Sequence, residues 1–182
     1  MINENKIRQI YKSNREQGFQ LLVECFQEPI YYYIRRLVVL HEDAEDVLQE
    51  VFIQVYRHWE QFRCESSLST WIYRIATNES INFLNEKKRK VYGNSGEITE
   101  ALENILESDV YFSGDEIQKE LQKAVLKLTD RQRLIFNMKY FDDMPYEDIA
   151  AILDVAVGTL KATYHNAVKK IEENMRIIDS QF

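Results

Sequence analysis

The sequence predicts an all-α protein of two small helical domains, joined by an acidic, flexible linker, with a helix-turn-helix in the second domain. The 182 residues include only 5 glycines and 2 prolines, fewer than a turn-rich β-sandwich needs. Apolar residues recur at spacings of three and four through most of the chain, which is the pattern of helices that bury one face. Because no strand pattern alternates with these segments, a nucleotide-binding α/β fold is not expected.

Four helices are predicted in the first half of the chain, where the apolar spacing is regular. Pro29 falls inside the second of them. Because proline has no backbone N–H to donate, it predicts a bend or a break at that point. The four predicted ranges are 5–17, 19–40, 42–61 and 69–90.

Four further helices are predicted in the second half. Thr129 followed by Gln132 predicts a capping box at the start of one of them. Pro145 suits the first turn of another, where a missing N–H costs nothing. The four predicted ranges are 115–128, 130–141, 145–153 and 159–178.

The net charge of −7 is unevenly spread along the chain. Residues 1–90 carry 13 basic and 13 acidic side chains, residues 91–114 carry none and 5, and residues 115–182 carry 10 and 12. The middle segment also holds three of the five glycines and has weak periodicity. This composition predicts a linker over 91–114 between domains over 1–90 and 115–182, and most of the acidity belongs to that linker.

Several functional classes are not expected. Cys25 and Cys64 are single and far apart, which predicts neither a disulfide framework nor a metal cluster. The first residues lack a signal-peptide pattern and no apolar run reaches the length of a membrane span, so a cytoplasmic protein is expected. Without a paired-carboxylate, nucleophile–base or glycine-rich phosphate motif, we expect no enzyme activity, no cofactor and no small-molecule substrate.

The helix predicted over 42–61 has two patterned faces. Its core stripe consists of Ala44, Val47, Leu48, Val51, Phe52, Val55 and Trp59. The opposite stripe consists of Asp46, Gln49, Glu50, Ile53 and Arg57. If this stripe held charged residues alone, it would be typical of a helix face that is exposed to solvent. An isoleucine at the centre favours a protein-binding surface, because interfaces combine an apolar centre with a polar rim.

The helix predicted over 69–90 also has a second face, and it ends in a basic run over 87–90. That face consists of Trp71, Arg74, Asn78, Asn82, Asn85 and Arg89. Amides and guanidinium groups pair with base edges, and an aromatic ring stacks on an unpaired base, so the face suits a nucleic acid. The alternative is that the tryptophan packs in the core and the asparagines are solvated.

The last two predicted helices form a helix-turn-helix. The second of them turns Leu160, Tyr164, Ala167, Val168 and Ile171 inward. It leaves Thr159, Ala162, His165, Asn166 and Lys169 outward, on a face that suits a major groove. Lys161, Lys169 and Lys170 are candidate phosphate contacts. Helical hairpins of other function share this pattern, so the motif by itself leaves the function open.

The order of the motifs is more informative than any one of them. DAEDVLQEVFIQVYRHWEQF and SLSTWIYRIATNESINFL come first, with a basic end. LTDRQRLIFNMKYFDDMPYEDIAAILDVAVGTLKATYHNAVKKIE follows the acidic linker. This order resembles the extracytoplasmic-function (ECF) sigma factors of bacterial RNA polymerase, from about Phe19 to Glu172.

The resemblance implies a region-2 domain over 1–90, with two functions. The block 43–52 would dock on the clamp helices of the polymerase β′ subunit, with contacts from Asp43, Asp46, Gln49, Glu50 and Ile53. The loop 62–67 and the helix from Trp71 would melt and read the minus-10 element. The residues implied in that reading are Arg63, Ser67, Trp71, Arg74, Asn78, Asn82, Asn85, Lys88 and Arg89.

The resemblance implies a region-4 domain over 115–182 that contacts the polymerase β flap and reads the minus-35 element of promoter DNA. Its reading residues would be Thr159, Lys161, Ala162, Thr163, His165, Asn166, Lys169 and Lys170. The resemblance also implies a sequestering anti-sigma factor, which in this family is often membrane-bound.

The chain departs from the family pattern at a few positions. Asp154 stands where the family usually has glycine, and Asp adopts the left-handed conformation less readily. Ala162, Thr163 and Asn166 replace the common Ser, Arg and Arg of the reading helix, so the promoter sequence is not predicted. Asn82 stands where Asp is common.

Two other functions remain open from the sequence. One is a sigma-like decoy that binds only an anti-sigma regulator. The basic run over 87–90 and the lysines Lys161, Lys169 and Lys170 argue against a decoy, because they are candidate phosphate contacts. The other is an ordinary helix-turn-helix activator, which has no need of a protein-binding face on the helix over 42–61.

Overall fold

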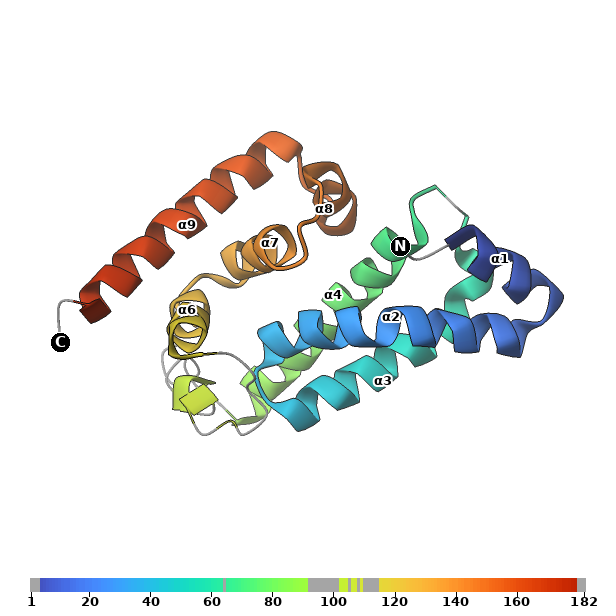
Figure 1. The fold of residues 1–182 in the computed structure, drawn as a ribbon, viewed down its shortest axis with the longest axis horizontal. Helices are drawn as coiled ribbons and strands as arrows, with labels where there is room; N and C mark the ends of the chain where they lie inside the picture. The colour runs from blue at the N-terminus through green and yellow to red at the C-terminus, as the bar shows by residue number, and fades with distance from the viewer. Residues whose placement is uncertain are drawn as a thin grey trace.

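The structure is a computed structural model that describes residues 4–63, 65–91, 102–104, 106–107, 109 and 115–179, without the side chains of 88, 90, 91 and 176–179. Helices account for nearly all of these residues, and no strand occurs among them, so the all-α prediction is confirmed (Figure 1). The labelled helices are α1 Glu4–Ser13, α2 Arg15–Val38, α3 His41–His58, α4 Leu68–Val91, α6 Glu116–Leu126, α7 Asp130–Tyr140, α8 Tyr146–Leu153 and α9 Val157–Asp179.

The first domain is built on α2, which packs against α1, α3 and α4. The buried face of α2 continues on both sides of Pro29. It consists of Leu22, Phe26, Ile30, Tyr33, Ile34 and Leu37. The sequence predicted a bend or a break at Pro29; the helix is continuous there, so of these two alternatives the break does not occur. Burial of this face on both sides of the proline outweighs the loss of one backbone hydrogen bond.

The boundary between the first two helices lies at Asn14 rather than near Gly18, where the sequence pattern predicted it. Asn14 is extended, and its side chain accepts a hydrogen bond from the backbone N–H of Gln17 at 3.1 Å, which caps α2. Gly18 is inside α2. A Cβ atom there would lie 2.3 Å from the Cα of Tyr11, so glycine is required for the close approach of α1.

The second domain contains α6 to α9 and confirms the predicted capping. Thr129 and Gln132 form the capping box of α7. Asp154 ends α8 in the left-handed conformation, with φ 54° and ψ 52°, so it takes the backbone geometry that the family usually gives to glycine. A short turn then leads into α9, and α8 and α9 form the predicted helix-turn-helix.

Part of the predicted linker is helical. Residues 102–104 and 106–107 are in helical conformation, and Leu102 and Leu106 pack with Val39 and Leu126. Their spacing of four was a helical signal in the sequence. Val39 has a positive φ of 70°, which is strained for a β-branched residue, and its burial in this cluster stabilises the strained turn.

The acidic side chains of this segment pair with basic residues from elsewhere in the chain. Asp109 pairs with Arg35, and Glu107 pairs with Lys123, which lowers the pKa of that carboxyl. Glu103 lies 3.7 Å from Lys127. The remaining linker acids, Glu97 and Glu100, lie outside the described residues.

The two domains pack against each other in a closed arrangement. α8 packs against α4, and α7 packs against α2 (Figure 1). Leu134, Ile135 and Met138 of α7 belong to the same buried cluster as the core of the first domain. Because this apolar surface is removed from water only when the domains meet, burial stabilises the closed arrangement.

Polar contacts accompany the apolar ones between the domains. Arg36 and Asp142 form an ion pair at 2.6 Å with both side chains largely buried. Thr70 of α4 donates to a carboxylate oxygen of Asp148 at 3.3 Å, and Arg74 donates to the backbone carbonyl of Ala151 in α8. Gln122 of α6 donates to the carbonyl of Arg36 at 3.1 Å.

Candidate nucleic-acid and protein interfaces

The outer face of α3 is open to solvent, as its sequence pattern predicted. Asp46, Gln49 and Ile53 are exposed, and Glu50 is half-buried. The side chain of Ile53 keeps 37% of its surface accessible, which is unusual for an isoleucine in a helix with a well-filled core stripe. Asp43 is also half-buried and pairs with Lys87 of α4, so it is already engaged within the domain.

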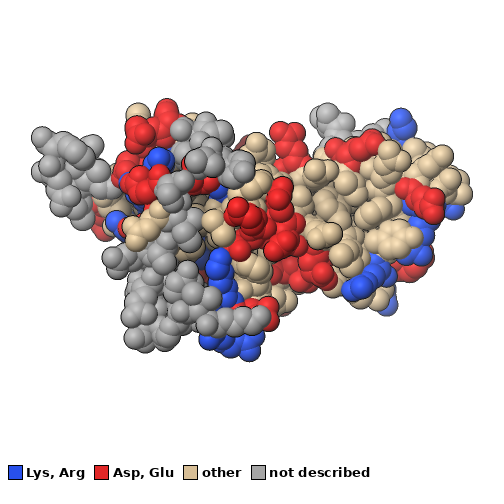
Figure 2. Space-filling view, turned by 90° about the horizontal axis from the view of Figure 1, so that it is seen from below, with Lys and Arg blue, Asp and Glu red and all other residues tan. Residues whose placement is uncertain are grey.

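This face is strongly acidic. Figure 2 views the molecule from the side on which α3 lies and shows Asp and Glu side chains gathered at its centre. Glu42, Glu45 and Asp46 are the exposed acidic residues of α3. Burial, and secondarily the nearby Glu50 carboxylate, raise the pKa of Glu79 on the adjacent α4. Carboxylates held this close favour a basic partner, because a cation relieves their mutual repulsion.

The start of α4 is held by a residue that the sequence analysis did not identify. The Glu4 carboxylate accepts hydrogen bonds from the backbone N–H groups of Leu68 at 2.8 Å and Ser69 at 3.0 Å. The Ser67 hydroxyl accepts one from the N–H of Thr70 at 3.0 Å. Together they cap the helix N-terminus, where backbone donors otherwise lack partners. A contact across 64 residues leaves no local signal in the sequence.

Trp71 belongs to an aromatic cluster at the start of α4. Its ring lies 5.0 Å from that of Phe62 and 6.2 Å, edge to face, from that of Trp59. Trp59 in turn stacks on Tyr11 of α1 at 3.8 Å. Trp71 is half-buried, so the packing role considered from the sequence is present and one part of the ring remains accessible.

The other residues expected on the reading face of α4 fall into three groups. Asn78, Asn82 and Arg89 are exposed, and so are Arg63 and Ser67 in the preceding segment. Arg74 and Asn85 face the second domain, Arg74 through its contact with Ala151 and Asn85 in the lining of an interdomain cavity. The side chain of Lys88 lies outside the described residues.

The outward face of α9 is open, as the helix-turn-helix pattern predicted. The exposed residues are Thr159, Lys161, Ala162, His165, Asn166, Lys169 and Lys170. Thr163 is half-buried, and its hydroxyl donates to the carbonyl of Thr159 at 2.8 Å. Lys161 lies 5.6 Å from the centre of the Tyr146 ring, which positions its ammonium group beside the N-terminal half of the helix.

Comparison with known proteins agrees with this arrangement. The chain matches the family Sigma-70 region 2 over residues 22–90 and the family Sigma-70, region 4 over residues 118–171. It is 30% identical to the ECF RNA polymerase sigma factor SigW of Bacillus subtilis, over 97% of this chain and 98% of that protein. The chain belongs to the ECF sigma factors of RNA polymerase. This sigma factor is also 29% identical to the ECF RNA polymerase sigma-E factor of Escherichia coli K12, over 88% of each chain.

Solved structures share the fold of this sigma factor. One is described as the sigma factor RpoE in complex with the anti-sigma factor NepR from Bartonella quintana; it has a TM-score of 0.70 and 21% identity, over 88% of this chain and 98% of that one. Another is described as CnrH in complex with the cytosolic domain of CnrY, with a TM-score of 0.69 and 16% identity, over 98% and 99% of the two chains.

Two further observations concern the described part of this sigma factor. None of its helices combines the length and the apolar character that crossing a membrane requires. Within the same residues, no three His, Cys, Asp or Glu side chains are grouped so that they could hold a metal ion.

Proposed function

We propose that this sigma factor acts in the cytoplasm, binds core RNA polymerase through the outer face of α3, and reads promoter DNA through α4 and α9. It acts as a binding protein without chemistry of its own. The minus-10 element would be read by the face of α4 that carries Asn78 and Asn82, and the minus-35 element by the outward face of α9.

The exposed Ile53 carries the proposal for α3. It lies among the exposed Asp46 and Gln49 and the half-buried Glu50, so the face has an apolar centre and a polar, acidic rim. A surface of this composition fits a basic, amphipathic helical partner such as the clamp helices of the β′ subunit. An ordinary helix-turn-helix activator has no use for it.

Replacing Ile53 with glutamate and Gln49 with alanine together is expected to weaken binding to core polymerase by about 30-fold. Loss of an interface centre costs on the order of 2 kcal/mol, which corresponds to that factor. Both side chains are exposed, so helical content should be unchanged. Gln9→Glu is the control, because Gln9 is exposed on α1, outside the proposed surface of α3 and outside the region-4 domain. Titration of labelled protein against core enzyme measures the effect, and unchanged affinity would contradict the assignment of this face.

Replacing Asn78 with alanine is expected to slow open-complex formation on a duplex promoter more than on a template with a pre-melted minus-10 region. An amide that pairs with a base edge is worth roughly 1 to 3 kcal/mol. Asn78 is the better test residue than Trp71, because it is exposed whereas Trp71 also supports the aromatic cluster. The rate of abortive initiation by holoenzyme on both templates measures the difference, and an equal loss on both would indicate a folding defect.

The free protein is expected to bind promoter duplex poorly, and the holoenzyme far better. Lys161, Lys169 and Lys170 provide only a few phosphate contacts, which give weak and salt-sensitive binding. The closed arrangement also engages Arg74 with α8. Holoenzyme adds its own DNA contacts and holds both reading domains on one template. Gel-shift titrations at matched salt compare the two, and tight sequence-specific binding by the free chain would favour the ordinary-activator alternative.

A sequestering anti-sigma protein is part of the proposal. One solved structure with this fold is a sigma factor in complex with an anti-sigma factor, and it supplies the precedent. The decoy alternative differs in its prediction for core polymerase. A decoy would retain the anti-sigma partner and fail to bind core enzyme in the titration described for Ile53.

A further inference from the structure

The helix α1 contacts both ends of the loop 62–67, which precedes α4 (Figure 1). The two contacts come from Glu4 and Arg8, which lie one helical turn apart and therefore share a face of α1. These side chains also pair with each other, with the Nη2 of Arg8 3.3 Å from a carboxylate oxygen of Glu4. The loop carries Arg63 and Ser67, two of the residues expected to read the minus-10 element, so its position bears on the proposed function.

Glu4 holds the end of the loop through both oxygens of its carboxylate. One oxygen accepts from the backbone N–H of Leu68 at 2.8 Å, and the other accepts from that of Ser69 at 3.0 Å. Hydrogen bonds to an ionised carboxylate are among the stronger ones, and two of them from one planar group fix direction as well as position. The first turn of α4 therefore cannot rotate relative to α1 without losing them.

Arg8 holds the start of the loop. The central carbon of its guanidinium group lies 5.1 Å from the centre of the Phe62 ring, which is the geometry of a cation–π contact. The Phe62 ring lies 5.0 Å from that of Trp71, another residue expected to read the minus-10 element. The start of the loop and the half-buried ring on α4 are thus held as one unit.

α1 is itself fixed on the first domain. Its Ile7 and Tyr11 are buried, and the Tyr11 ring stacks on that of Trp59 at 3.8 Å. Gly18 of α2 permits the close approach of the two helices. Side chains that project from a packed helix are placed more exactly than those on a loop, so α1 is a suitable support for the loop 62–67.

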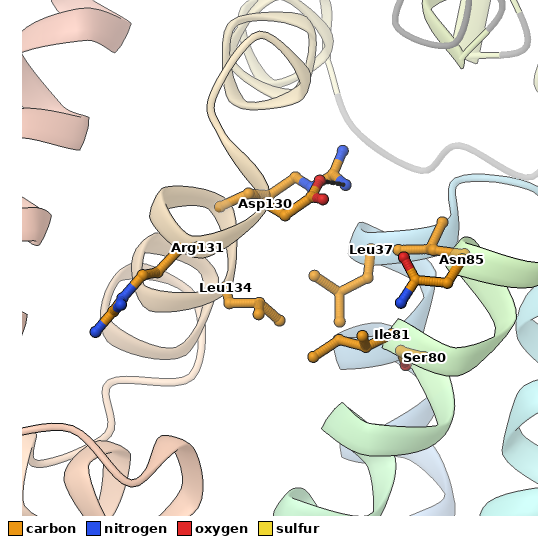
Figure 3. Close-up of a pocket in the computed structure, with 9 residues that line it drawn as sticks. Leu37, Ser80, Ile81, Asn85, Asp130, Arg131 and Leu134 are labelled. Atoms are coloured by element: carbon orange, nitrogen blue, oxygen red, sulfur yellow. Dashed lines mark hydrogen bonds and ion pairs between the residues drawn. The ribbon is translucent and has the colours of Figure 1, made fainter. Parts of the chain in front are cut away.

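All of these contacts lie within the first domain. The α7 helix of the second domain meets α4 well beyond the loop, where Figure 3 shows Leu134 of α7 directed toward Ile81. Separation of the two domains would therefore leave the contacts of α1 with the loop in place, so they are available in the holoenzyme.

We propose that α1 positions the loop 62–67 for separation of the DNA strands at the minus-10 element, through Glu4 and Arg8. This inference rests on the proposed reading of that element by the loop and α4. Glu4 and Arg8 are positioning residues that act through the loop. Without them the loop would have to be ordered at the moment it meets DNA, and that entropic cost would slow opening.

Replacing Glu4 with glutamine keeps the size of the side chain and removes its charge and one of its acceptors. We expect open-complex formation at saturating holoenzyme to slow about fivefold, the factor that corresponds to the usual loss of a helix cap. Arg8→Met, which removes the cation beside Phe62, should slow it about threefold. Gln9→Ala, at an exposed position of α1, should leave the rate unchanged.

The rate of abortive initiation on a duplex promoter measures these effects. Circular dichroism and an unchanged affinity for core enzyme show that each variant is folded, and two variants guard against a single misfolded one. Folded Glu4→Gln and Arg8→Met proteins that open the promoter as fast as the unaltered sigma factor would overturn the proposal.

A double-mutant cycle with Arg63→Ala distinguishes positioning of the loop from a general loss of stability. If Glu4 acts through the loop, Glu4→Gln should have less than about a twofold further effect once Arg63 is replaced. A rate that falls by the product of the two single effects would contradict the positioning role. If Arg63→Ala alone leaves the rate unchanged, the proposed role of the loop is wrong and the positioning role with it. If Arg63→Ala slows opening and neither α1 variant does, the proposed function stands and the positioning role is wrong.

Discussion

Replacing Gly18 with alanine is expected to lower the free energy of unfolding by about 3 kcal/mol, the upper part of the usual range for overpacking. The new Cβ would lie 2.3 Å from the Cα and 2.5 Å from the backbone nitrogen of Tyr11. Backbone atoms cannot move aside as a flexible side chain does, so α1 must shift. Its buried Ile7 and Tyr11 and the Glu4 cap of α4 would be displaced with it.

Gly158→Ala is the control within the same chain. Apart from its chain neighbours and the backbone of its own helix, no atom lies within 4 Å of the position that a Cβ would take at Gly158. Alanine is the better helix former, so this variant should be unchanged or more stable by up to about 1 kcal/mol. Urea unfolding followed by circular dichroism measures both. A Gly18→Ala protein as stable as the original would show that α1 does not pack as closely as described.

Replacing Asp142 with leucine is expected to weaken the interface between the domains by about 3 kcal/mol, because the buried Arg36 guanidinium would lose its hydrogen-bond acceptor. In a double variant that also carries Arg36→Met, most of the lost stability of the interface should be recovered. Burial raises the pKa of Asp142 although Arg36 acts to lower it, so the ionised carboxylate is held at a cost. An apolar pair of similar volume avoids that cost.

Two spectroscopic probes distinguish the unfolding of the two domains in this experiment. Trp59 and Trp71 are the only tryptophans of the sequence, and both belong to the first domain, whereas helical circular dichroism reports on both domains. In the single variant the circular-dichroism transition should begin at lower urea than the fluorescence transition, and in the double variant the two should coincide again. Coincident transitions in the single variant would mean that the ion pair does not hold the domains together.

The pH dependence of the same pair has a definite sign. Because the pKa of Asp142 is raised in the folded protein, the folded state takes up this proton at a higher pH than the unfolded chain does. The contribution of Asp142 to stability therefore increases as the pH falls through its folded pKa and is lost as the pH rises through it.

Features governed by short sequence spacing were predicted well. The helices, the Thr129 capping box and the exposed Ile53 all follow from residues within a few turns of each other. Helical periodicity assigns each residue to a face, which is why the outward faces of α3 and α9 were identified from the sequence. The roles of the residues on those faces stay predictions.

Features that depend on distant residues were not predicted. Glu4 caps a helix that begins 64 residues later, and Arg36 pairs with a residue 106 positions away. Gly18 was interpreted as a helix boundary because its close contact with Tyr11 is a property of the packed pair. Periodicity shows that a face is buried or exposed, and it does not show which element covers it.

The face of α3 is open to solvent in the same arrangement that engages Arg74 with α8. The proposed docking on core polymerase through α3 therefore would not have to wait for the domains to separate, and the opening would follow as a unimolecular step. The observed rate of productive assembly should rise with the concentration of core enzyme and then level off at the opening rate. Changes at Arg36 or Asp142 would move that plateau, whereas changes at Ile53 would alter the initial slope.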